Sequence, residues 1–413
     1  MSAKPITDEE IRTRLQIIES VGLEAAANQL GMTTSGLRTT QVEARRRKIT
    51  ANGAVSEEAK LRTKVKALTA ELSAIHRDNI TADEIRRTIY GLSADTPSPP
   101  SWLAGSGKAA KSSGVPMVMW SDWHWGERVF PDQVGGVNEF NRDIGKSRVR
   151  TLVDTTVDLT MNHMTYPEYP GIVVVLGGDM ISGGIHEELR ETNEGPLQVT
   201  LLEVQEQLIA ALTVMADTYG KVFVPCVVGN HGRMTHKPRA KHRVFESYEW
   251  NLYCQLERHF KNDKRVQFLI PSEADAHFSV AGHRFMLTHG DALGVKGGDG
   301  IIGALGPIAR GALKVGRSEA QVGRDFDTLI IGHWHQYIPR GEAVPVIVNG
   351  ALKGYDEYAR LGLRARYARP SQALWFVHPK FGITAQWQIF LEPLRKTDKD
   401  RGAAWVTWET RKD

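Results

Sequence analysis

The chain has 413 residues, a hydrophobic content of 41%, a charged content of 24% and a formal net charge of +4. This length allows two or three domains, and the composition is that of an ordinary globular protein, which excludes fibrous and disordered classes. No apolar run approaches the roughly 20 residues of a membrane span, and the polar start is not a signal peptide. We therefore expect a cytoplasmic protein without a membrane partner, in which Cys226 and Cys254 are buried and unpaired.

Residues 1–50 predict three short helices. Thr7 and Glu10 form a capping box that opens the first helix, and Gly22 ends it. A second helix is expected over residues 23–30, and a third runs from residue 34 to residue 47.

The spacing of Ala27, Gly31 and Leu37 resembles the helix-turn-helix unit of DNA-binding proteins, whose second helix enters the major groove. The side chains that would contact phosphates and base edges are Thr34, Ser35, Arg38, Thr39, Gln41, Arg45, Arg46, Arg47 and Lys48. The alternative is a small helical bundle whose basic run is a solvated face. A positive balance of charge fits DNA as the partner.

Residues 51–92 predict a helical connector. Its apolar residues follow a heptad spacing over about two repeats, which suits a short coiled coil and a homodimer, or a helix packed on its own neighbours. These residues are Leu61, Val65, Leu68, Leu72 and Ile75. Thr81 and Glu84 form a further capping box. Residues 93–114 are rich in Ser, Gly and Pro and predict a flexible linker, and residues 396–413 are assigned as a C-terminal tail.

Residues 115–395 alternate strand-like and helix-like segments, which predicts an α/β layered fold. The expected strands are 118–120, 172–176, 222–228, 285–288, 328–331 and 346–348. The expected helices are 146–161, 198–216 and 246–260, and a closing hairpin is expected over 373–378 and 384–390.

Most of these strands end in residues of the metal-ligand type, where open α/β sheets place their sites. Asp122 and His124 follow the first strand, and residues i and i+2 of an extended chain point to the same side. The later strands end in four motifs, namely G-G-D with Asp179, G-N-H with Asn230 and His231, H-G-D with His289 and Asp291, and G-H-W-H with His333 and His335.

This ordered set resembles the calcineurin-like metallophosphoesterase superfamily over residues 115–350, and within it the Mre11/SbcD-like nuclease branch and phosphoesterases common in phage genomes. The resemblance implies a four-layer αββα sandwich that holds two metal ions, commonly manganese. If the protein is encoded by a phage, we expect it in the cytoplasm of the host. The first metal would take Asp122, His124, Asp179 and His335, and the second would take Asp179, Asn230, His289 and His333.

Oxygen and imidazole ligands explain this set chemically. Two close divalent cations need a bridging carboxylate, for which Asp179 is the natural candidate, and they activate a hydroxide that attacks phosphorus. The ligands suit manganese, with iron, zinc or magnesium as alternatives. His231 would stabilise charge or protonate the leaving oxygen. Many relatives carry an acid directly after G-N-H, whereas this chain has Gly232, so a carboxylate partner for His231 must come from elsewhere.

A basic stretch without acids follows the G-N-H motif, and such a loop suits a phosphate backbone. The residues expected to bind substrate are Arg233, Lys237, Arg239, Lys241 and Arg243, accompanied by His236 and His242. We therefore expect a hydrolase that is a metal-dependent DNA nuclease with its own DNA-binding domain. The alternatives are a phosphomonoesterase or protein phosphatase with the same metals, and a DNA-binding regulator with an inactive phosphoesterase domain.

Overall fold

The computed structural model describes residues 6–47, 49, 51, 100–104, 114–293, 305–339 and 345–393. The chain consists of two compact units, Met1–Thr81 and Ala82–Asp413. The first, which we call the helical unit, contains helices α1 to α3, and the second, which we call the sandwich, contains every described strand. The predicted heptad connector, the second capping box and the C-terminal tail lie outside the described residues.

The helical unit has the three predicted helices, α1 (Asp8–Val21), α2 (Leu23–Leu30) and α3 (Thr34–Arg47). The predicted capping box is present at the start of α1. Gly31 ends α2 with φ of 61°, a left-handed conformation that glycine adopts without strain. Ala26, Ala27 and Leu37 form the buried core, so small residues allow α2 and α3 to pack closely.

The first sheet of the sandwich has six strands in the order β11-β10-β1-β2-β3-β4. β1 to β4 are parallel, and β10 joins β1 antiparallel. The strands are β1 (Val115–Trp120), β2 (Ile172–Leu176), β3 (Val222–Pro225), β4 (Val266–Leu269), β10 (Ser371–His378) and β11 (Gly382–Phe390).

Both faces of this sheet are buried at β1, β2 and β3, which explains why these strands are continuous apolar runs. Val118 and Trp120 point to a core shared with helices, whereas Met117 and Met119 point to the core between the two sheets. The helices on the outer face are α6 (Arg142–Met161), α8 (Leu197–Tyr219) and α9 (Tyr248–Phe260).

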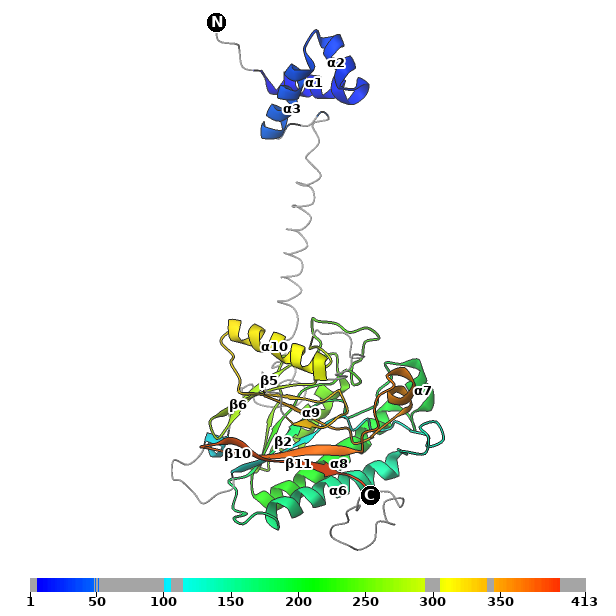
Figure 1. Cartoon of the computed structure of the whole chain (residues 1–413), viewed down its shortest axis with the longest axis vertical. Helices are drawn as coiled ribbons and strands as arrows, with labels where there is room; N and C mark the ends of the chain where they lie inside the picture. The colour runs from blue at the N-terminus through cyan, green and yellow to red at the C-terminus, as the bar shows by residue number, and fades with distance from the viewer. Residues whose placement is uncertain are drawn as a thin grey trace, which may run out of the picture. The chain divides into compact units, whose positions relative to one another are not determined.

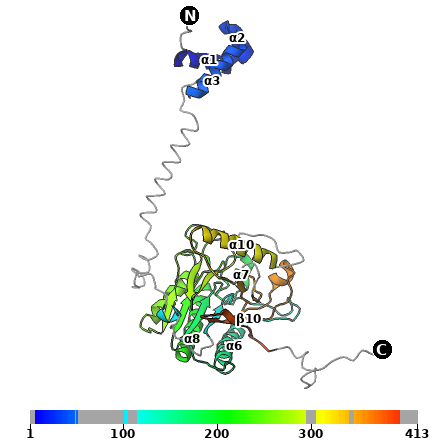
Figure 2. The ribbon, with the colours of Figure 1, turned by 60° about the vertical axis from the view of Figure 1, so that its left-hand side comes forward.

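The second sheet has five strands in the order β5-β6-β7-β9-β8. They are β5 (Ala276–Val280), β6 (His283–Thr288), β7 (Thr328–Ile331), β8 (Ile338–Pro339) and β9 (Val346–Val348). Phe285 and Ile330 face the first sheet, and Leu329 faces outward to α10 (Leu305–Gln321). The packing therefore has four layers, with α10 on the far side of the sandwich from α6 and α8 (Figures 1 and 2).

The predicted strands at residues 172–176, 328–331 and 346–348 are confirmed, as is the closing hairpin. Two helices were not predicted, α10 and the short α7 (Glu187–Thr192). Glycine and proline within α10 argue against a helix, but Gly311 has a packing role. A Cβ there would lie 3.0 Å from Leu293, so glycine lets the helix approach that side chain closely.

Part of the segment predicted as a flexible linker packs on the sandwich. Ser101–Ala104 forms a 3-10 turn, η1. Leu103 is buried in the core between the sheets, and its carbonyl accepts a 2.7 Å hydrogen bond from the Ala281 amide. The chain is thus anchored to the sandwich before β1 begins.

Both cysteines are buried and form no disulfide with each other, as predicted. By length and composition, α8 is the one helix of the described residues that is apolar enough to cross a membrane. Its Val204, Leu208 and Leu212 are fully buried against the first sheet. Val199, Leu202 and Val214 of the same helix are exposed, so α8 packs on the sheet with one face.

Candidate metal centre

The loops that follow β1 and β2 are hydrogen bonded to each other and carry three of the predicted ligands. The Asp122 amide donates to the Gly178 carbonyl, and the His124 amide donates to the Asp179 carbonyl, each over 3.0 Å. Asp122, His124 and Asp179 are at most 1% exposed. Two carboxylates buried this deeply require nearby cations or donors.

The predicted ligands also share a backbone conformation. Asp122, His124, Asp179, His333 and His335 all have positive φ, between 47° and 64°. Non-glycine residues rarely adopt this region, and each such residue costs on the order of 1–3 kcal/mol. The backbone is therefore strained at five positions, and all five carry side chains of the metal-ligand type.

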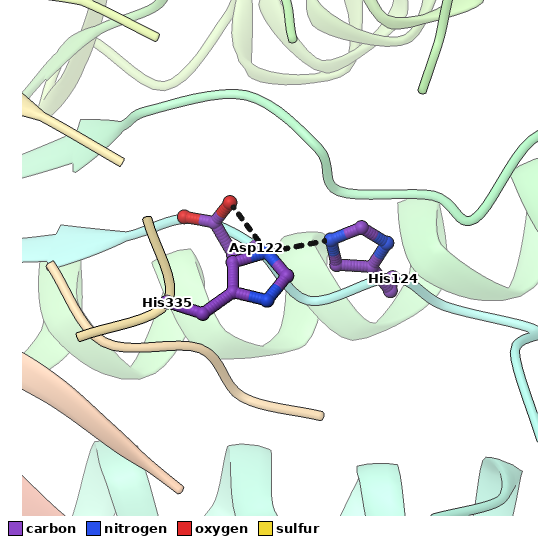
Figure 3. Close-up of side chains that lie close together, drawn as sticks. All are labelled: Asp122, His124 and His335. Atoms are coloured by element: carbon purple, nitrogen blue, oxygen red, sulfur yellow. Dashed lines mark hydrogen bonds and ion pairs between the residues drawn. The ribbon is translucent and has the colours of Figure 1, made fainter. Parts of the chain in front are cut away.

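A first group consists of Asp122, His124 and His335 (Figure 3). His335 Nε2 lies 3.3 Å from Asp122 Oδ1 and 3.1 Å from His124 Nε2. Figure 3 shows that His335 comes from a segment remote in sequence and meets the other two side chains at their polar ends.

A second group consists of Asp179, His289 and His333. His289 Nε2 lies 3.0 Å from Asp179 Oδ2 and 3.2 Å from Asn230 Oδ1, so Asn230 belongs to the same cluster. A third group of His124, Asp179 and His231 overlaps both, and His124 Nε2 lies 3.9 Å from Asp179 Oδ2. Asp179 thus lies between the first and the second group.

In His289 and His124, the second ring nitrogen, Nδ1, lies close to an oxygen atom of the protein. His289 Nδ1 lies 2.8 Å from the Gly177 carbonyl, and His124 Nδ1 lies 3.2 Å from Glu127 Oε2. The Gly177 carbonyl places a proton on Nδ1 of His289 and leaves its Nε2 facing the centre, the arrangement common to metal-binding histidines.

Burial and charge set opposite protonation states for these two rings. Burial lowers the pKa of His124 to about 3, with help from the positive charge of Lys353. Burial also acts to lower the pKa of His289, but the Asp179 carboxylate outweighs it and raises this pKa to about 10. Burial acts to raise the pKa of Asp122, and His335 reverses the effect and holds it below its usual value.

Three glycines make room for the ligands. A Cβ on Gly229 would collide with the Asp179 carboxylate, and a Cβ on Gly332 would lie 2.5 Å from Asp122 Oδ2. Gly178 has φ of 87°, and a Cβ there would lie 2.5 Å from the Gly229 amide nitrogen and 2.9 Å from His289 Nδ1. The glycines of the motifs are therefore required by close approach.

His231 lies beside this centre without a carboxylate partner. Its Nδ1 is 2.8 Å from the Ser182 carbonyl, and its amide donates to Asp179 Oδ1 over 2.8 Å. In place of a carboxylate, a backbone carbonyl accepts a hydrogen bond from Nδ1 and so directs Nε2 to the site. His186, at the start of α7, lies with its ring centroid 6.0 Å from that of His231.

The basic loop after G-N-H is largely engaged in its own structure. Arg243 bonds both oxygens of Asp291 at 2.6 and 2.7 Å, and Arg239 pairs with Glu246 at 3.0 Å. Arg233 donates to carbonyls of its own loop, including that of Asn230 at 3.2 Å. Three of the five predicted substrate residues, Lys237, Arg239 and Lys241, are exposed, and of these Arg239 is paired with Glu246.

Sequence reasoning did not identify four charged residues behind the ligands. Lys353 is 3% exposed and lies between Glu127, at 2.8 Å, and Asp356, at 2.5 Å, so a buried ion network supports the carboxylate that orients His124. Glu249 is fully buried, and burial raises its pKa to about 7. None of the four lies in a glycine–histidine motif, and they come together only in the folded chain.

On α3, the predicted DNA contacts Thr34, Ser35 and Arg38 are exposed, as are Arg45 and Arg46, while Gln41 is half-buried. Arg47 is held within the helical unit, because it bonds Glu43 at 2.7 Å and Asp8 at 3.1 Å. Arg46 lies 3.7 Å from Glu43.

The donor set of the centre fits divalent cations. It combines imidazole nitrogens with carboxylate and amide oxygens, contains no thiolate, and brings the ligand atoms of each group within 4.8 Å of one another. Burial of the two carboxylates and the left-handed backbone at five ligands show that the protein holds these atoms together by its own fold.

Comparison with known proteins gives distant matches. No family model and no curated protein matches the sequence. Among solved structures, vacuolar protein sorting 29 from Cryptosporidium parvum matches with 11% identity and a TM-score of 0.26, over 63% of this chain and 84% of its own. The sulfate thiohydrolase SoxB from Thermus thermophilus matches with 11% identity and a TM-score of 0.30, over 70% of this chain and 59% of its own. A protein described as a 5′-nucleotidase from Staphylococcus aureus matches with 11% identity and a TM-score of 0.29, over 70% and 57%.

Proposed function

We propose that the sandwich is a dinuclear metal-dependent phosphoesterase of the calcineurin-like type and that it hydrolyses phosphodiester bonds in DNA. The observation that carries the proposal is the set of three ligand groups, of which the third shares His124 with the first and Asp179 with the second. Their members follow separate strands of both sheets, so the site exists only because the sandwich brings its strand ends together.

One cation would be held by Asp122, His124, Asp179 and His335, and the other by Asp179, Asn230, His289 and His333. Two such cations supply an activated water and neutralise the charge of a phosphate. The protein presents the two carboxylates ionised, because the net shift of the pKa of both Asp122 and Asp179 is downward.

His231 is the residue placed to act on the substrate. Because the Ser182 carbonyl only accepts hydrogen bonds, Nδ1 carries a proton, and Nε2 is the atom that faces the centre. A protonated Nε2 donates to a phosphate oxygen or gives its proton to the leaving oxygen. The carbonyl thus orients the ring in the role for which an acid was expected.

Two observations support DNA as the substrate. Lys237 and Lys241 project into solvent from the loop that follows His231, where they would meet phosphates next to the scissile one. The exposed basic residues of α3 would bind the duplex backbone, with Thr34 and Ser35 at the helix start near base edges. The pairing of Arg239 and Arg243 with acids limits the charge that this loop offers, which favours the monoesterase as the second candidate.

The test incubates the full chain with Mn²⁺ and with labelled duplex DNA, labelled single-stranded DNA, an aryl phosphate monoester and an aryl phosphate diester. We expect cleavage of DNA and of the diester. Asp179→Asn is the control and is expected to lower turnover by more than about 100-fold, since changes behind the ligands alone cost 10–100-fold. If only the monoester is hydrolysed, the protein is a phosphomonoesterase and not a nuclease. If no ester is hydrolysed, the hypothesis of a DNA-binding regulator with an inactive phosphoesterase domain is the one that stands.

A further inference from the structure

Glu249 is a buried carboxylate that the reaction described above does not use. It is the second residue of α9, and Ser247 caps the helix by accepting a 3.2 Å hydrogen bond from the Glu249 amide. The side chain is 0% exposed. A carboxylate is favoured at a helix N-terminus, but burial close to the Asp179 carboxylate opposes its charge.

Both oxygens of this carboxylate bind backbone amides of the ligand loops. Oε1 accepts from the Met180 amide and Oε2 accepts from the Gly229 amide, each over 2.6 Å. Met180 directly follows Asp179, and Gly229 directly precedes Asn230. One side chain from α9 therefore ties the loop after β2 to the loop after β3 at the points where their ligands emerge.

The carboxylate occupies the space beside Gly232. A Cβ on Gly232 would lie 2.6 Å from Glu249 Cγ and 2.8 Å from its carboxyl carbon. Gly232 does not have positive φ, so a side chain at position 232 is excluded by Glu249 and not by the backbone. Gly232 and Glu249 therefore share one volume, which only one side chain can fill.

We propose that Glu249 is a positioning residue that fixes the separation of Asp179 from Asn230, on which the second metal position depends. This inference rests on the proposed dinuclear site. Without the carboxylate, two buried amides lose their acceptor and the two loops are held together by fewer hydrogen bonds, among them that of the His231 amide to Asp179 Oδ1, so the position that needs both Asp179 and Asn230 is weakened first.

The first experiment compares the full-length protein with Glu249→Gln and Glu249→Ala. It measures Mn²⁺ bound per chain after dialysis, the Mn–Mn coupling in electron paramagnetic resonance, and turnover of the aryl diester. We expect Glu249→Ala to lose one Mn²⁺ and the coupling signal and to turn over about 10–100-fold more slowly. Glu249→Gln keeps one of the two acceptor oxygens, so its metal content and turnover should lie between those of the original protein and those of Glu249→Ala. Asp263→Asn, which removes a carboxylate bonded to Arg265 beyond the other end of α9, is the matched control.

The second experiment returns the carboxylate from position 232. The carboxyl carbon of a glutamate stands two bonds from its Cβ, so Gly232→Glu combined with Glu249→Ala places an acid in the vacated volume. This double variant should regain the second Mn²⁺ and most of the turnover, whereas Gly232→Gln with Glu249→Ala, which offers one acceptor oxygen in place of two, should regain less of both.

The inference is overturned if Glu249→Gln, folded by circular dichroism, binds two Mn²⁺ as tightly as the original chain. It is also overturned if the folded Gly232→Glu double variant regains no metal. Because metal content is measured directly, a protein that binds two Mn²⁺ but cleaves no ester refutes the proposed function and still tests Glu249.

Discussion

His289 is the ligand on which protonation and metal binding compete most directly. Its Nε2 lies 3.0 Å from Asp179 Oδ2, and in the metal-free protein this carboxylate holds a proton on the ring up to a pKa of about 10. A metal needs the same nitrogen unprotonated. Metal uptake therefore releases this proton, and affinity for metal rises with pH.

The stability of the metal-free protein should consequently fall as pH rises. The folded pKa of about 10 lies above the ordinary 6.5, so the stabilisation is complete below pH 6.5 and is lost as pH rises through 10. Urea unfolding in excess chelator checks this window. His289→Gln should remove the pH-dependent loss, and an equal slope in both proteins would refute the assignment.

His231 should matter most for substrates with poor leaving groups. If Nε2 protonates the leaving oxygen, His231→Asn should slow DNA cleavage by roughly 10²–10⁴-fold, the range of general acid catalysis. An aryl diester leaves without a proton and should lose much less. Steady-state kinetics on both substrates measure the difference, and an equal loss on both would assign His231 to charge stabilisation alone.

At the scale of elements, the loop after β9 supports the centre through buried charges. Lys353 reaches Glu127, and Glu127 in turn contacts His124. Arg148 of α6 fixes this loop by donating to the Leu352 and Lys353 carbonyls over 2.9 and 2.7 Å. A helix on the outer face thus contributes to the orientation of a ligand.

Lys353→Met should therefore destabilise the sandwich and weaken the centre. It leaves the Glu127 and Asp356 carboxylates buried without their cation, which costs about 3–5 kcal/mol. Urea unfolding measures this loss, and metal titration should show lower affinity because His124 loses its orientation. Lys264→Met, at an exposed lysine, is the control, with an expected change within about 0.5 kcal/mol.

The arginines of α3 should differ in their effect on DNA binding. Arg38 is exposed, so Arg38→Ala should reduce the slope of log K against log salt by about 1. Arg47 is bonded to Glu43 and Asp8, and Arg47→Ala should change helix stability more than the slope. Fluorescence anisotropy with duplex DNA in a salt series measures both, and identical slopes would contradict a phosphate contact at Arg38.

At the scale of the whole molecule, each unit has a core of its own. Leu37 and its neighbours are buried within the helical unit, and three separate cores hold the four layers of the sandwich. The chain divides between Thr81 and Ala82. Chemistry and DNA affinity should therefore be separable.

A chain that begins at Ala82 should keep the turnover of the aryl diester but bind duplex DNA roughly 100-fold more weakly, since linked binding modules gain affinity on that scale. Turnover assays and anisotropy on the same preparations measure both. Unchanged DNA affinity would show that the helical unit is a bundle with a solvated basic face.

The sequence by itself determined the helices of the helical unit, the strands that carry the ligand motifs and the closing hairpin, but not β4, β5 or β8. Short apolar runs such as residues 172–176 and 328–331 avoid solvent whatever surrounds them, and β2 and β7 have the bounds that these runs predict. Glycine next to aspartate or histidine is a local pattern as well, and the seven predicted ligands are found close together.

Only the tertiary structure decided which groups support these ligands. Glu249 fills the space at Gly232, Arg243 is bound by Asp291, and α10 forms despite its glycines because it covers the second sheet. Such contacts join residues far apart in the chain, and no local pattern encodes them. They depend on which surfaces the folded layers bring within hydrogen-bonding distance.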